Sequence, residues 1–203
     1  MFLLLIASLF MREVDDYVNA MTIDEANSTI KKVLKINKAG LCLVPLQLYA
    51  LKQCSGIPRD NPSLIVGDFD GNGSDDICAY MKEYGLQYDR KQKHFFIITH
   101  LVVFLKSGDN KWIVREINKA IHLLPFEIKE TGLLEYITIM KKEDVDKKRS
   151  FQYGAEMEKK IVRFVTNGNS SLFITLNMCG RATFVYVWDA IKKEFFRVCI
   201  DDG

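Results

Sequence analysis

The residues of this chain whose types and spacing could do chemistry are concentrated in one stretch, GDFDGNGSDD at positions 67–76. Carboxylate and amide side chains stand at alternate positions in it, and Gly73 follows them where the backbone can bend sharply with a positive φ. Such a loop suits Ca2+, which takes about six to eight oxygen ligands in flexible geometry, whereas zinc prefers nitrogen and sulfur. The stretch therefore predicts Ca2+ as a cofactor, held by Asp68, Asp70, Asn72, the carbonyl of Ser74, and Asp76.

Two other structures could produce the same pattern. An EF-hand begins in the same way, but it needs a bidentate Glu where this chain has Ala79, and it is flanked by helices. A metal-free turn, in which Asn72 and Gly73 simply reverse the chain, also fits the residues. The metal is favoured because four acids within nine positions repel one another unless a cation neutralises them.

The run also resembles the calcium loop of FG-GAP and VCBS-type proteins. This resemblance implies the same five ligands and leaves Asp75 out of the set. A propeller would repeat the loop in several blades, but it occurs once in 203 residues, so we expect one globular unit. The closing hairpin, with Tyr186, Trp188, Asp189 and then Phe195, is similar to that of small exported bacterial proteins of unknown function with one such loop.

The loop must be positioned by the short apolar runs on either side of it, which predict strands over Leu64–Val66 and Ile77–Lys82. Upstream, Met21–Asn37 predicts a helix that begins with a capping box of Thr22 and Glu25. The other expected elements are a short helix at Val44–Lys52, a hairpin of Phe95–Leu105 and Lys111–Ile117, a strand or helix at Gln152–Val165, and strands at Leu133–Lys141, Leu172–Asn177, Thr183–Trp188 and Phe195–Ile200.

These elements predict an α+β fold. We expect one or two N-terminal helices packed on a mostly antiparallel β-sheet or open barrel of about 6–8 strands, with one β-loop-β calcium hairpin. The length and a hydrophobic fraction of 48% fit a single domain, which we place at residues 21–203. The net charge of +2 does not favour a nucleic-acid partner.

Residues 1–20 begin with the apolar run MFLLLIASLF and predict a signal peptide, although no Lys or Arg precedes the run. The alternative is a buried N-terminal helix. The run is too short to span a bilayer, which needs about twenty residues, so we expect no transmembrane span. Export would suit the loop, because calcium outside the cytosol reaches millimolar concentrations and saturates modest sites. The expected location is therefore periplasmic or secreted.

The five cysteines, at positions 42, 54, 78, 179 and 199, form no C-x-x-C motif, so a zinc knuckle is not expected. In an exported protein, Cys42 and Cys54 are the first candidates for a disulfide, because the chain between them is short. The alternative is that the cysteines are buried as small apolar side chains.

The chain contains no G-x-S-x-G elbow, no H-E-x-x-H helix and no Walker loop, and His100 in its apolar run is expected to be a satisfied core or edge residue. We therefore expect an exported, non-enzymatic, calcium-stabilised binding protein with a protein partner, in one form an inhibitor or immunity-type partner of a secreted protein. One alternative is a cytosolic domain with an empty loop. Another is a calcium-dependent hydrolase, which would need acids that converge in space, chosen from Glu116, Glu127, Glu135 and Glu156.

Overall fold

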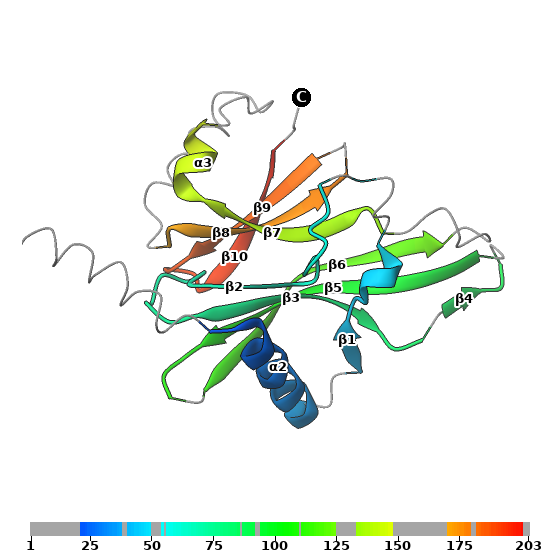
Figure 1. The fold of residues 1–203 in the computed structure, drawn as a ribbon, viewed down its shortest axis with the longest axis horizontal. Coiled ribbons are helices and arrows are strands. Elements are labelled where there is room, and N and C mark those ends of the chain that lie inside the picture. Colours follow the sequence, from blue (N-terminus) through cyan, green and yellow to red (C-terminus); the bar gives the residue numbers. More distant parts are fainter. Residues whose placement is uncertain are drawn as a thin grey trace, which may run out of the picture.

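The structure is a computed structural model, and it describes residues 21–37, 40–49, 54, 56–85, 87–91, 94–109, 111–124, 133–147, 170–179 and 182–200. Strands dominate these residues and form two antiparallel sheets, so the fold is mostly β and α+β-like (Figure 1). The helical elements are α2 (Ile23–Asn37), α3 (Lys142–Lys147) and the 3-10 helix η1 (Leu46–Leu48). None of the helices in this part of the chain is long and apolar enough to cross a bilayer.

The first sheet has six strands with β3 and β5 at its centre. β3 pairs with β1 and β2 along one edge and with β5 along the other. β4 pairs with the start of β5, on the same side of β5 as β3. β5 pairs with β6 over nearly its whole length, with a bulge between Leu101 and Val102. The strands are β1 (Leu41–Leu43), β2 (Leu64–Gly67), β3 (Asp76–Glu83), β4 (Gln87–Asp89), β5 (His94–Lys106) and β6 (Trp112–Leu124).

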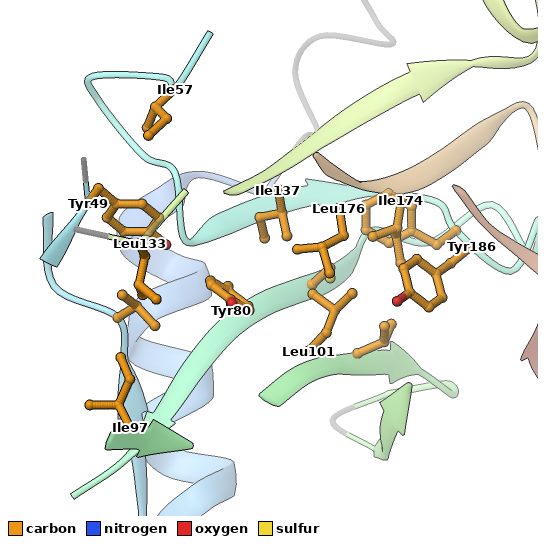
Figure 2. Packing of buried hydrophobic residues seen from close by; sticks show 14 of the residues in the cluster. Tyr49, Ile57, Tyr80, Ile97, Leu101, Leu133, Ile137, Ile174, Leu176 and Tyr186 are labelled. Carbon is orange, nitrogen blue, oxygen red and sulfur yellow. The ribbon is translucent and has the colours of Figure 1, made fainter. Parts of the chain in front are cut away.

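The second sheet has four strands in the order β10-β9-β8-β7, each antiparallel to its neighbour. Its apolar face packs against one face of the first sheet, and this face of the first sheet is called the inner face below. Figure 2 shows Tyr80 and Leu101 of the first sheet facing Ile137, Ile174 and Leu176 of the second. The strands are β7 (Glu135–Lys141), β8 (Leu172–Met178), β9 (Ala182–Asp189) and β10 (Glu194–Ile200).

Helix α2 covers the outer face of the first sheet. Its apolar stripe of Ala26, Ile30 and Val33 is buried against alternate residues of β3, including Ala79 and Met81. β3 is therefore buried on both faces, and Asp76–Met81 are all buried in a continuous run. This strand carries the last residue of the candidate loop, so the loop ends on the most deeply buried strand of the sheet.

Several predicted elements are confirmed. The strands that flank the loop are β2 and β3, the long hairpin is β5 and β6, and the C-terminal strands are β7 to β10. The capping box is also present: the Thr22 amide donates to Glu25 Oε2 at 2.8 Å, and the Glu25 amide donates to Thr22 Oγ1 at 3.3 Å. The Thr22 hydroxyl also donates to Glu25 Oε2 at 2.9 Å, and the hydrogen bonds that this carboxylate accepts from the Thr22 amide and hydroxyl lower the pKa of the exposed Glu25 side chain.

Other predictions are wrong. The strands divide into a six-stranded and a four-stranded sheet, not one sheet or open barrel, because alternation identifies strands without saying which of them pair. The helix expected at Val44–Lys52 shrinks to η1, since Tyr49 is already extended and forms a parallel bridge with Leu133. The possible signal peptide at 1–20 and the element expected at 152–165 lie outside the described residues.

The expected disulfide between Cys42 and Cys54 is also wrong, because Cys54 is bonded to Cys179, 125 positions away. Cys42 lies on β1 at the edge of the first sheet, whereas Cys54 is buried in the core between the sheets, beside the end of β8. Proximity along the chain was therefore a poor guide. Among the described residues Cys42, Cys78 and Cys199 are free.

Candidate metal site

The acidic loop, defined here as residues 68–76, joins β2 to β3 across the last pair of their ladder, Gly67 opposite Asp76. Its two glycines, Gly71 and Gly73, have φ values of 76° and 83°. These left-handed conformations suit glycine, as expected from the sequence for Gly73. They fold the loop back on itself, so that side chains far apart along it face one another.

The loop brings together three of the five predicted ligands. Carboxylate oxygens of Asp68, Asp70 and Asp76 all lie within 4.8 Å of one another. Asp68 accepts three main-chain hydrogen bonds, from Gly71 at 2.8 Å, Asn72 at 3.0 Å and Gly73 at 2.9 Å. The tip of the loop is therefore wrapped around the Asp68 carboxylate.

Asp76 connects the loop to the sheet. Its Oδ2 accepts hydrogen bonds from the amides of Phe69 (2.9 Å) and Asp70 (3.3 Å), and its Oδ1 accepts one from the amide of Lys106 (2.8 Å) at the end of β5. The side chain is fully buried. Burial raises the pKa of Asp76 to about 7, opposed by the Lys106 hydrogen bond and reinforced by the negative charge of Asp70. Burial also raises the pKa of Asp70.

The structure does not bring the Asn72 oxygen into this group. The side-chain amide nitrogen (Nδ2) of Asn72 donates to Asp70 Oδ2 at 3.0 Å and to the carbonyl of Lys106 at 2.9 Å. Its Oδ1 instead accepts the amide of Ser74 at 2.8 Å. Asn72 and Ser74 thus hold the loop in shape, while their part as metal ligands stays a prediction.

The three carboxylates have spare capacity for a cation. A carboxylate offers roughly four lone-pair positions, of which the described residues use three on Asp68, three on Asp76 and two on Asp70. Each side chain therefore keeps at least one position free. A hard divalent cation fits such an all-oxygen donor set, and the donor set fits calcium better than zinc. The identity of the ion stays a prediction.

The loop is also tied to other parts of the chain. The Ser170 hydroxyl, just before β8, donates to the carbonyl of Asp68 at 2.8 Å. Gly67 packs so closely on β8 that an added Cβ would lie 2.8 Å from Leu172 Cδ1. Asp75 points away from the group and accepts the amide of Met21 at 2.5 Å, next to the start of α2. These contacts connect the loop to both sheets and to the start of the helix.

A cleft of about 410 Å3 lies beside the loop. It is lined by the stretch from Asp70 to Asn72 and by Ala190 and Lys193 of the β9–β10 turn. The rest of the lining comes from β9, from the β5–β6 hairpin and from the turn between β5 and β6: Trp188, Leu105, Lys106, Ser107, Ile113 and Arg115. Trp188 belongs to the hairpin resemblance noted above, whereas no sequence signal pointed to Arg115.

A buried polar cluster between the sheets was also missed. The Tyr80 hydroxyl donates to Glu135 Oε2 at 2.7 Å and lies 3.1 Å from Thr99 Oγ1, and His122 Nε2 lies 2.7 Å from the same Thr99 oxygen. Burial lowers the pKa of His122, opposed by the charge of Glu135, and burial raises the pKa of Tyr80 well above its ordinary value. The four side chains provide hydrogen-bond partners for one another, so we interpret the cluster as a structural polar network.

Of the four acids named for a hydrolase, the two in the described part of the chain, Glu116 and Glu135, do not converge. Glu116 bonds to His100, which also lies 3.3 Å from Glu83, on the α2 side of the sheet. Glu135 bonds to Tyr80 on the inner face. His100 is 5% exposed and has two carboxylate partners, so its prediction as a satisfied residue is confirmed. The other two acids, Glu127 and Glu156, lie outside the described residues.

Comparison of the chain with protein-family models, with curated proteins and with solved structures finds no match. The site is therefore interpreted from its own geometry.

Proposed function

We propose that this chain is a calcium-stabilised binding protein that works in an oxidising compartment, periplasmic or extracellular, and has a protein as its partner. The observation that carries the proposal is the convergence of the Asp68, Asp70 and Asp76 carboxylates within 4.8 Å. Three negative charges at that separation repel one another strongly in a partly buried loop. A bound cation removes the repulsion, and Asn72 and the Ser74 carbonyl are the further ligands that we propose.

The ion would act as a structural clamp. The Asp76 carboxylate accepts a hydrogen bond from the Lys106 amide at the end of β5, and the Asp68 carbonyl accepts one from the Ser170 hydroxyl just before β8. An ion shared by the Asp68 and Asp76 carboxylates would thus couple the ends of the central strands of the first sheet to the second sheet. We therefore assign the ion a stabilising role, because the carboxylates that would hold it are hydrogen-bonded into the ends of the strands.

The Cys54–Cys179 disulfide supports the proposed compartment. Disulfides persist in oxidising environments and are rare in the cytosol. Calcium is also most available there, so a site of modest affinity would remain filled. A role as an inhibitor or immunity-type partner of a secreted protein is one form that this binding function would take.

Thermal unfolding with calcium and with a chelator tests the proposal. At a calcium concentration a hundred times the dissociation constant, we expect a gain of about 2.7 kcal/mol, or about 5–11 °C for a chain of this size. Asp70→Asn should lose the gain. Asp75→Asn is the matched control, because it removes the same charge from the same loop outside the carboxylate group. Equal melting temperatures of the wild-type protein in calcium and in chelator would overturn the proposal.

A further inference from the structure

We propose that the cleft beside the acidic loop is the partner-binding site, and that it takes an acidic side chain of a partner protein together with an apolar side chain next to it. This deepens the proposed function and rests on it for the protein partner and for the calcium dependence described below. The cleft, about 410 Å3, has the size of a pocket that receives one or two side chains.

Three cations line the cleft, Lys106, Arg115 and Lys193. Lys106 pairs with Trp112 of the cluster under α2, so we assign the positive charge of the cleft to Arg115 and Lys193. Arg115 pairs with Val103, and Val103 is buried in the core between the sheets, so Arg115 lies on the inner face of β6. Neither cation forms an ion pair with any residue that the structure describes. The neighbouring Lys192, in contrast, lies 3.8 Å from Glu194. Two cations that pair with no described acid, in a cleft with the single carboxylate of Asp70 in its lining, leave a net positive charge that is complementary to a carboxylate from outside.

The cleft also has an apolar part in its lining. Trp188 lies in its lining and contacts Phe195 with ring centroids 5.0 Å apart. Ile113 is 41% exposed in the same cleft. Tryptophan and arginine in a concave site are the residues that most often dominate protein–protein binding. An apolar side chain beside the carboxylate would cover these groups.

The turn that presents Lys193 has an unusual backbone. Lys193 has a φ of 56°, a left-handed conformation that favours glycine, and it is the only non-glycine residue of the described chain with a positive φ. Its amide donates to the Asp189 carbonyl at 2.7 Å, which closes the turn. A lysine in a position suited to glycine makes the turn less stable than it could be, which is expected where a side chain serves binding.

The acidic loop opposes an acidic ligand unless it holds a cation. Asp70 lines the same cleft as Lys193. Its charge would repel an incoming carboxylate, and neutralisation by calcium would remove that repulsion. Calcium and the acidic ligand should therefore strengthen each other's binding by the same factor, as linkage requires.

The test uses the full chain and the indole N–H signals of its two tryptophans in NMR titrations. The probe is the peptide acetyl-Phe-Glu-Phe-Glu-amide, and acetyl-Phe-Gln-Phe-Gln-amide is its neutral match. The acidic peptide should shift the Trp188 signal saturably and leave Trp112 unmoved, because Trp112 packs in the cluster under α2. The neutral peptide should bind at least about threefold more weakly.

Variants distinguish binding in the cleft from a general effect of the protein's charge on peptide affinity. Arg115→Gln should lower the affinity for the acidic peptide about three- to tenfold. Lys193→Gly should also weaken it while leaving the melting temperature unchanged or higher, a combination that a purely structural role would not give. Lys192→Gln is the matched control, since it removes one charge from the same turn outside the cleft, and its affinity should stay within about twofold.

The outcomes are distinguishable. No shift of Trp188, or equal losses in the Lys192 and Lys193 variants, would overturn the cleft as the binding site. Galacturonate or inorganic phosphate shifting Trp188 more strongly than the peptide would replace the protein partner by a small anion, and would also overturn the inference. Peptide binding that is unchanged by a chelator, in a protein that calcium does not stabilise, would uphold the cleft and refute the calcium proposal.

Discussion

Loss of the Cys54–Cys179 disulfide should destabilise this protein strongly. The bond closes a segment of 125 residues, and the chain-entropy relation gives about 5 kcal/mol for a segment of that length. Residual structure in the unfolded chain lowers the figure, so we expect a loss of about 2–5 kcal/mol in the free energy of unfolding. The bond also joins the segment after η1 to the end of β8, so its loss frees both that segment and the end of β8.

Urea unfolding followed by tryptophan fluorescence measures this loss. Wild-type protein should lose stability in dithiothreitol, and the double variant Cys54→Ala with Cys179→Ala should be equally unstable with and without the reductant. The double variant Cys42→Ala with Cys199→Ala is the control, because both of its thiols are free, and it should retain the response to reductant. A wild-type protein whose free energy of unfolding changes by less than about 1 kcal/mol on reduction would refute the reasoning.

Three further predictions concern packing, capping and pH. Gly67→Ala should cost about 1–3 kcal/mol in urea unfolding, because the new Cβ would lie 2.8 Å from Leu172 Cδ1, and Leu172→Ala in the same chain should relieve part of the clash. Thr22→Ala should cost about 1 kcal/mol through loss of the helix cap, and Thr22→Ser should restore it; equal stability of all three proteins would contradict the capping role. Burial holds the pKa of His122 below its unfolded value of about 6.5, so protonation favours the unfolded chain, and stability should fall as pH drops from 6.5 through the folded pKa. His122→Gln should flatten that fall in urea titrations, even with Glu135 nearby, and an unchanged slope would show that another group is responsible.

The sequence predicted the features that depend on local patterns. The capping box, the N-terminal helix and the hairpin of β5 and β6 each depend on a short segment, and each is confirmed. Gly73 was recognised in the same way, because a bend between ligand positions needs a positive φ. The convergence of Asp68, Asp70 and Asp76 follows from that bend and from the ladder of the two flanking strands.

The features that the sequence did not predict depend on contacts between distant segments. The division into two sheets, the Cys54–Cys179 bond and the cluster of Tyr80, His122 and Glu135 each join residues that are far apart in the chain. Arg115 gave no signal, because a single arginine on an alternating strand does not show what lies opposite it. The orientation of the Asn72 amide is set by the Lys106 carbonyl, which the loop sequence alone cannot reveal.

Isothermal titration of calcium into chelator-treated protein tests the central claim most directly. The account predicts one calcium ion per chain, no heat of specific binding for Asp70→Asn, and binding like that of the wild-type protein for Asp75→Asn. Absence of calcium binding by the wild-type protein, or equal binding by the Asp70→Asn variant, would contradict the claim that these three carboxylates hold the ion.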